Sequence, residues 1–142
     1  LNCLVDSKEG KKVSVKMGSY GIGVSRLVGA IIEANYVDEV MKWPREVSPY
    51  DVVIIPNINK NNNENLLKAN KIYDELRKQK IDVLLDDVDE NMSIKFKKHD
   101  LIGIPYQIII GSKSKVNEFE FKEINSESEI LNLDKIIEKI KS

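Results

Sequence analysis

Two glycines and an arginine between residues 21 and 26 are the residues whose types and spacing point most directly to chemistry. Gly21 and Gly23 stand just before a stretch in which apolar residues have helical spacing, and Arg26 falls in its first turn. Glycines let a ligand approach the backbone, and the start of a helix offers free N–H groups and a positive dipole end. The segment is therefore a candidate site for an anion or a nucleotide.

The arginine at position 26 excludes two common nucleotide motifs. A dinucleotide fingerprint needs a third glycine at that position, and a phosphate loop needs Gly-Lys-Ser/Thr in this turn. The positive charge of a guanidinium in the first turn is unfavourable next to the positive end of the helix dipole, so a bound ligand would explain why an arginine stands there. A guanidinium can bind phosphate with two N–H groups or stack on a base. The alternative is that Arg26 is an exposed helix residue and that the glycines only turn the chain.

Single copies of cysteine and histidine limit the remaining chemistry. Cys3 cannot form an internal disulfide, which favours a reducing compartment, and no neighbour in the sequence would activate its thiol. One histidine, His99, leaves no His/Cys cluster for zinc. The net charge is -1, so binding of nucleic acid would need a local basic patch.

The length and composition are those of a soluble globular protein. The 142 residues, 42% apolar and 32% charged, suffice for one domain or for one domain plus a piece of another. No apolar run approaches the length that crosses a bilayer. The chain starts Leu-Asn-Cys without a basic-then-apolar leader, so we expect no signal peptide and a start inside a longer protein.

The first 49 residues predict a hairpin, a loop, a helix and a linker. Strand-like segments 1–5 and 13–17 flank the turn residues 6–10, and a loop follows at 18–23. Prolines and the lack of a periodic pattern mark 36–49 as a connection between units. The helix begins near Val24, ends near Ala34, and has one apolar face formed by Val24, Leu27, Val28, Ile31 and Ile32.

Residues 51–110 alternate between strands and helices. The expected strands are 51–56, 81–85 and 106–110, and the expected helices are 63–80 and 94–101. Strands separated by helices imply parallel pairing through right-handed crossovers. This order predicts an α/β fold.

The C-terminal residues allow two interpretations. Ser126 and Glu129 could form a capping box at the start of one long helix. In the other interpretation, which we prefer, 125–128 is a hairpin turn, 129–131 is a return strand, and a shorter helix starts at Asn132 or Asp134. Phe119 and Phe121 share one strand face in front of this turn and are expected in the core.

The segment "MGSYGIGVSRLVGAIIE" resembles motif 3 of class II aminoacyl-tRNA synthetases, in the form seen in bacterial-type prolyl-tRNA synthetases. Ser19 stands where that family usually has cysteine. The resemblance continues through Trp43-Pro44 and Pro49-Tyr50 into "DVVIIPN", "VLLDD", "IKFKKHDLIGIPYQIIIG" and "LDKIIEKI", which are similar to the anticodon-binding domain of the same family. It therefore extends over essentially the whole chain.

The resemblance implies a domain plan and a fold. Residues 1–36 would be the end of the catalytic domain, a strand-helix remnant that contains motif 3, and 37–49 would be a linker. Residues 50–142 would be the anticodon-binding domain, a mixed, mostly parallel sheet flanked by helices. Residues 1–36 are expected to be poorly ordered in isolation, because their apolar face lacks its sheet partners.

The resemblance also implies roles for the glycine-rich turn. Arg26 would be the motif 3 arginine that contacts ATP, with Gly21 and Gly23 allowing the nucleotide close to the turn. The parent enzyme would use ATP and Mg²⁺ to attach proline to its tRNA, through attack of the proline carboxylate on the α-phosphate, with Arg26 stabilising charge. No residue is a candidate general acid or base, and motifs 1 and 2 of the family are absent from this sequence. We therefore expect that this piece alone does not activate proline.

The implied RNA-binding residues include a departure from the family. Asp86, Asp87, Lys95, Phe96, Asp100, Gly103 and Pro105 match it. Val88 and Asn91 stand where the family has arginines, and Ser93 replaces a glycine, which puts in doubt any salt bridge or RNA contact of those arginines. His99 stands where the family has another residue and is expected at the surface.

Three lysines are candidate tRNA contacts. Lys95 could contact the RNA or form an ion pair with Asp86 or Asp87. Lys113 and Lys122, with Lys115, lie near the last strands and could form a basic patch, the alternative being ordinary solvated lysines. Phe96 is expected in the core rather than as a stacking platform.

The implied parent is a cytoplasmic homodimer whose partners are the anticodon loop of proline tRNA, proline and ATP, with no membrane or DNA. The alternatives are a threonyl, histidyl or glycyl synthetase that shares the domain, a non-catalytic RNA-binding accessory protein, and a flavodoxin-like nucleotide binder. The amino-acid sequence around Arg26 favours the proline enzyme.

Overall fold

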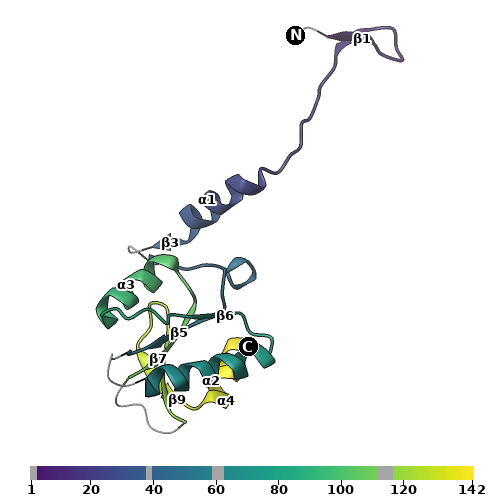
Figure 1. Cartoon of the computed structure of the whole chain (residues 1–142). Coiled ribbons are helices and arrows are strands. Elements are labelled where there is room, and N and C mark those ends of the chain that lie inside the picture. The colour runs from purple at the N-terminus through teal and green to yellow at the C-terminus, as the bar shows by residue number, and fades with distance from the viewer. Residues whose placement is uncertain (1–2, 38–39, 59–62, 112–116) are drawn as a thin grey trace.

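The computed structural model describes residues 3–37, 40–58, 63–111 and 117–142, and its centre is one five-stranded sheet (Figure 1). The strand order is β6-β5-β7-β8-β9, with β5 parallel to β6 and β7, and with β7-β8 and β8-β9 antiparallel. The predicted mixed α/β sheet is confirmed. The strands are β5 (Val52–Pro56), β6 (Val83–Leu85), β7 (Tyr106–Ile110), β8 (Phe119–Glu123) and β9 (Ser128–Leu131).

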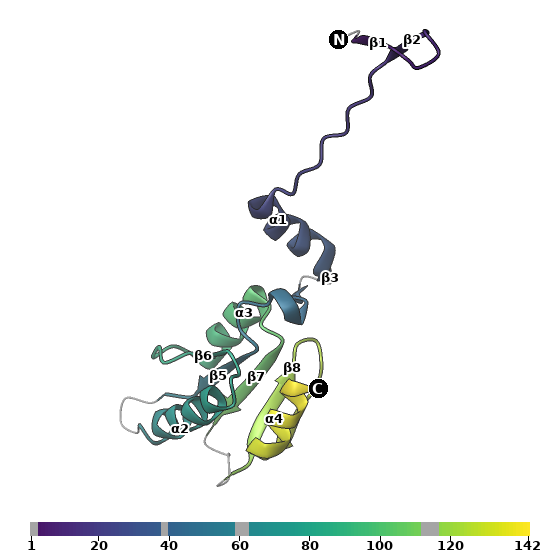
Figure 2. The same ribbon diagram turned by 90° about the vertical axis from the view of Figure 1, so that its right-hand side faces the viewer.

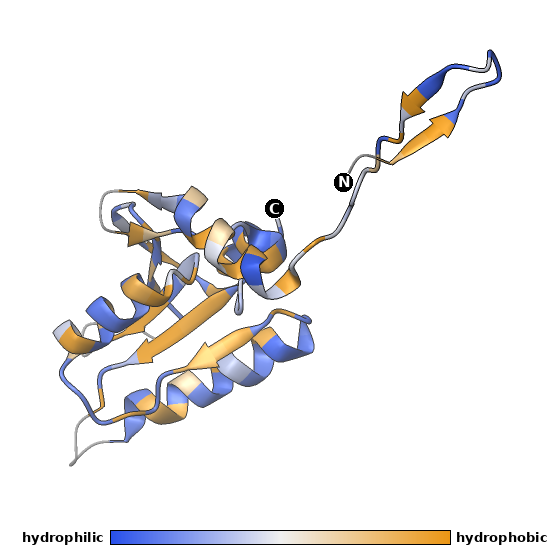
Figure 3. Cartoon of the chain, turned by 90° about the horizontal axis from the view of Figure 1, so that it is seen from above, coloured by the Kyte–Doolittle hydropathy of each residue, from blue (hydrophilic) through white to orange (hydrophobic). Residues whose placement is uncertain are grey.

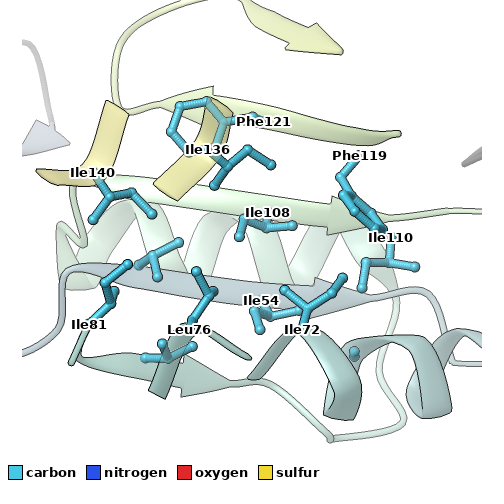
Figure 4. Close-up of a cluster of buried hydrophobic side chains, with 13 residues drawn as sticks. Ile54, Ile72, Leu76, Ile81, Ile108, Ile110, Phe119, Phe121, Ile136 and Ile140 are labelled. Carbon is cyan, nitrogen blue, oxygen red and sulfur yellow. The ribbon is translucent and has the colours of Figure 1, made fainter. Parts of the chain in front are cut away.

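Two helices cover one face of this sheet and a third covers part of the other. Apolar residues of α2 (Glu64–Lys78) and α4 (Leu133–Lys141) meet the side chains of Ile54, Ile108 and Phe121 in the larger core cluster (Figure 4). Helix α3 (Met92–Ile102) packs on the opposite face, where Val53 and Ile55 form the smaller cluster. Because β5 is buried on both faces, its sequence is a continuous apolar run rather than an alternation.

The hairpin interpretation of the C-terminal residues is confirmed. Strands β8 and β9 pair antiparallel across a turn in which Asn125 has a positive φ of 62°. Ser126 lies in this turn, so the capping-box alternative is wrong. The last helix instead starts after Asn132, whose side chain accepts a hydrogen bond from the Lys135 backbone N–H at 3.0 Å.

The N-terminal third lies apart from the sheet body. The predicted hairpin is present as β1 (Leu4–Asp6) paired with β2 (Lys12–Ser14), and the predicted helix as α1 (Val24–Asn35). An extended stretch separates the hairpin from α1, and both stand away from the sheet (Figure 1). The hairpin is clear of the sheet in the view from above as well (Figure 3). No residue of α1 is buried, so its apolar stripe faces solvent in this chain.

The segment between α1 and the sheet contacts α3. It contains β3 (Tyr36–Val37), β4 (Val40–Met41) and the short 3-10 helix η1 (Arg45–Val47). Met41 is buried against Gly103, and the indole N–H of Trp43 donates a hydrogen bond to the carbonyl of Ile102 at 2.8 Å. The expected linker is thus packed on the C-terminal unit, whereas the boundaries at 36 and 49 stay predictions.

Candidate nucleic-acid interface

The carboxyl ends of the parallel strands β5 and β6 bring polar groups together at one edge of the sheet. In open α/β sheets this edge is where ligands bind, because the loops that follow the strands converge there. The last residue of β5 is Pro56, and β6 is followed directly by Asp86. Helix α3, which starts after the cap residue Asn91, lies over the same edge (Figure 2).

Asp86 is the centre of a buried cluster at this edge, and its residue is only 4% exposed. Its Oδ2 lies 2.9 Å from Lys98 Nζ and 2.6 Å from His99 Nε2. Its Oδ1 accepts a hydrogen bond from the backbone N–H of Val88 at 3.3 Å and lies 3.6 Å from Lys95 Nζ. The carboxylate therefore joins the end of β6, the following loop and α3.

Lys95 lies inside the domain, with no exposed surface. Its ammonium donates to the carbonyl oxygens of Pro56 at 3.2 Å and of Asp86 at 3.0 Å, which ties the ends of β5 and β6 together. Of the two readings of Lys95, the structure favours the ion pair with Asp86, because the ammonium cannot reach an RNA on the surface in this arrangement.

The expectation that His99 lies at the surface is wrong: the residue is 2% exposed. With Asp86 ionised, Nε2 carries the proton and donates to it, and Nδ1 has no hydrogen-bond partner among the described residues. The position was missed because apolar spacing does not identify a buried histidine. One feature of the sequence could have indicated its burial: His99 follows Lys95 by four residues and therefore lies on the same face of the helix.

Burial and hydrogen bonds act in opposite directions on the pKa values of this cluster. Burial raises the pKa of Asp86, but the hydrogen bonds from Lys98 and His99 and the nearby Lys95 charge outweigh it, so the pKa lies below its ordinary value. Burial lowers the pKa of His99, and the Asp86 carboxylate only partly offsets this. The hydrogen bond to Asp86 raises the pKa of Lys98. The cluster is thus ionised at Asp86 and Lys98 and neutral at His99 at pH 7.

The loop between β6 and α3 is exposed throughout, from Asp87 to Asn91. The loop contains Asp87, Asp89 and Glu90, whose carboxylates can accept hydrogen bonds from base edges. On α3, Lys97 is exposed and has no ion pair among the described residues, whereas Lys98 is shared between Asp86 and Glu90. Acceptors and cations therefore stand side by side at this edge.

Lys122 lies on the side of the sheet that α3 covers in part. Phe119 and Phe121 point into the larger core cluster, as predicted, so Lys122 points to the other face. It is half-buried, stands opposite Gln107 on β7, and forms no ion pair within the described part of the chain. Gln107 in turn donates to Asp100 of α3 at 2.8 Å. Lys113 and Lys115 lie outside the described residues.

Arg26 and its glycines are not brought to this edge. Arg26 is exposed in the first turn of α1, and its side chain has no hydrogen bond or ion pair among the residues described. Apart from its neighbours in the chain, no described residue has an atom within 4 Å of the position that a Cβ would occupy at Gly21, so the backbone there is open to a ligand. Phe96 packs on the smaller core cluster as expected, and Cys3 is exposed.

The described residues contain neither a cluster of metal ligands nor a helix that could span a membrane. They hold no group of three or more His, Cys, Asp or Glu side chains that could bind a metal ion. No helix among them has the length and apolar character needed to span a membrane.

Comparisons with known proteins agree with the observed sheet. The profile of the HGTP anticodon binding domain family matches residues 51–142. The proline–tRNA ligase of Pelagibacter ubique is 58% identical over 138 residues, which are 96% of this chain and 31% of that protein. Those of Rickettsia canadensis and Parvibaculum lavamentivorans are 46% and 49% identical over 96% and 80% of this chain, and 32% and 26% of their own lengths.

This chain spans about a third or less of the curated relatives that it matches. The family profile, in contrast, matches the whole unit from β5 to α4. The chain belongs to the HGTP anticodon binding domain family.

Proposed function

We propose that this chain is the C-terminal part of a proline–tRNA ligase and that residues 50–142 bind the anticodon loop of proline tRNA. The observation that carries the proposal is the 58% identity to such a ligase over 138 residues, which include both the Arg26 turn and the anticodon binding domain. A threonyl, histidyl or glycyl enzyme could share the domain but not this degree of identity to a proline–tRNA ligase.

We place the RNA on the edge formed by the loop 87–91 and α3, with Lys122 beside it on the same sheet face. Bases of an anticodon loop are unstacked and can be read on their edges, for which exposed carboxylates such as Asp87 and Glu90 are acceptors. Lys97 and Lys122, which form no ion pair with any described residue, supply cations for phosphates. Since the chain has a net charge of -1, these local cations must supply the attraction.

We propose that Arg26, Gly21 and Gly23 contact ATP in the whole enzyme. A guanidinium suits a phosphate, and the open backbone at Gly21 would let the nucleotide approach. In the parent, attack of the proline carboxylate on the α-phosphate would give prolyl-adenylate, with Arg26 and Mg²⁺ stabilising the charge, before transfer to tRNA. The parent would be a cytoplasmic homodimer, and this piece alone would not activate proline.

The proposal is tested by titrating the chain, at one fixed low salt concentration, with two anticodon stem-loop RNAs. One has the proline anticodon, and the other differs only in the two guanines that pair with proline codons. We expect replacement of the guanines to weaken binding by more than about 1 kcal/mol, the size of one lost base contact. Equal affinities with equal salt slopes would favour an accessory protein that binds only the RNA backbone.

A further inference from the structure

The loop 87–91 is held to the fold by polar contacts, and the contacts at its start converge on one carboxylate. Asp86 receives hydrogen bonds from the Val88 backbone, from Lys98 and from His99, and its own backbone N–H donates to Ile54 on β5 at 3.0 Å. Every residue of the loop is exposed, so the loop has no apolar anchor. Glu90 pairs with Lys98 at 3.4 Å and Asn91 caps α3, which fixes the end of the loop, whereas the position of its start depends on Asp86.

The geometry of Asp86 depends in turn on His99. The two side chains are both at least nine-tenths buried, and their 2.6 Å contact fixes which way the carboxylate faces. A hydrogen bond to an ionised group is stronger than one between neutral groups. His99 is 2% exposed and does not reach a bound RNA, and the hydrogen bond described for its side chain is the one to Asp86.

We propose that Asp86 and His99 are positioning residues for RNA recognition: they hold the loop 87–91 in the conformation that distinguishes anticodon bases. The proposal rests on the proposed function, because it takes the loop as part of the RNA-binding edge. Lys95 stabilises the same arrangement from inside the domain, because its ammonium joins the ends of β5 and β6 through their carbonyl groups.

The first test compares two variants at His99 in the 142-residue chain, with the two stem-loop RNAs described above. His99→Gln keeps an N–H donor that can reach Asp86, and His99→Leu removes it. Both side chains are neutral at pH 7.5, as His99 is, so the charge of the surface does not change. We expect the Leu variant to lower the ratio of the two affinities about fivefold and the Gln variant to keep it within about twofold.

The second test separates positioning from charge. Asp86→Asn and Asp74→Asn each remove one negative charge, but Asp74 is exposed on α2, on the sheet face opposite α3, and has no hydrogen bond or ion pair within the described part of the chain. Electrostatics alone would make both variants bind RNA more tightly. We expect Asp86→Asn to lose discrimination between the RNAs and Asp74→Asn to retain it. An equal effect of both changes would overturn the proposal.

A measurement on the unchanged chain keeps the proposal testable if the variants fold poorly. His99 is the only histidine, so the proton on its Cε1 atom gives the one histidine Hε1 signal of the NMR spectrum. We expect the proline-anticodon RNA to shift that signal at saturation and the guanine-replaced RNA to shift it less. An unmoved signal with both RNAs would refute positioning, whereas equal affinity of the unchanged chain for both RNAs would refute the proposed function itself.

Discussion

Trp43 and Ile102 lie 59 residues apart, yet the indole N–H of the first donates to the carbonyl of the second at 2.8 Å. Ile102 is the last residue of α3, so this bond satisfies a carbonyl that the helix itself leaves free. The segment before the domain thus completes the end of the helix whose first turns lie at the proposed RNA edge. Residues 40–43 are for this reason part of the stable unit.

The first prediction concerns this bond. Trp43→Phe keeps an aromatic side chain and removes the donor, and we expect it to lower the free energy of unfolding by about 1 kcal/mol. Urea denaturation followed by circular dichroism measures the change. Tyr36→Phe changes an exposed aromatic residue outside this contact and is the matched control. Its free energy of unfolding should stay within about 0.5 kcal/mol of that of the unchanged chain. A Trp43→Phe variant as stable as the control would show that the segment does not support α3.

The second prediction concerns Gly103, which follows α3. Its φ of 80° disfavours a side chain, and an added Cβ would lie 2.5 Å from the carbonyl oxygen of Met41. Gly103→Ala should therefore destabilise the domain by more than about 1 kcal/mol, since both the backbone and the packing oppose it. Gly29→Ala is the control, because no described atom outside its own helix turn and chain neighbours lies within 4 Å of that Cβ position and alanine favours the surrounding helix. Thermal unfolding of both variants and of the unchanged 142-residue chain measures the two effects. A Gly103→Ala variant as stable as Gly29→Ala would contradict the prediction.

The sheet could be predicted from the sequence because its pattern is local. Strand β7 was expected at 106–110 and lies there, and the hairpin of β8 and β9 follows from alternation and turn residues. An ion pair of Lys95 with Asp86 was one of the two roles considered for Lys95, but the burial of Lys95 and His99 could not be predicted in this way, because apolar spacing anticipates aliphatic residues at buried helix positions. The bond between Trp43 and Ile102 is equally invisible, since it joins segments far apart in the chain.

The third prediction is a pH dependence caused by His99. Its folded pKa lies below the ordinary value of 6.5, so the unfolded chain binds the proton first as the pH falls. The free energy of unfolding should be at its full value above about pH 6.5 and should decline from there toward the lower folded pKa. Asp86, whose pKa is also lowered, adds a further loss in more acidic solution. Urea titrations between pH 5.5 and 7.5 isolate the histidine, because carboxylates have already ionised there.

His99→Gln provides the control for that dependence. Glutamine does not titrate, and no second histidine exists, so the decline between pH 7.5 and 5.5 should disappear in the variant. If the variant and the parent lose stability in parallel over this range, the dependence comes from another group and the assignment to His99 is wrong.

The fourth prediction separates a buried lysine from a surface lysine. Lys95→Met leaves the carbonyl groups of Pro56 and Asp86 without their donor and should cost about 3 kcal/mol of stability, as loss of one partner of a buried pair does. The salt dependence of RNA binding should be unchanged, because the ammonium does not reach a phosphate. Lys122→Met should leave the free energy of unfolding nearly unchanged, and it should reduce the slope of log affinity against log salt concentration by about 0.7. A reduced slope in Lys95→Met would mean that this side chain leaves the core to bind RNA.

The fifth prediction concerns the N-terminal third. Leu27 and Val28 of α1 are about half exposed, and no residue of that helix is buried, so its hydrogen bonds lack the protection of a core. Amide hydrogens of β1, β2 and α1 should exchange orders of magnitude faster than those of β5, whose residues are all buried. Mass spectrometry of peptides from the exchanging chain measures this directly. Protection in residues 3–36 equal to that of β5 would contradict the prediction and would require a partner surface for the apolar face of α1 within this chain.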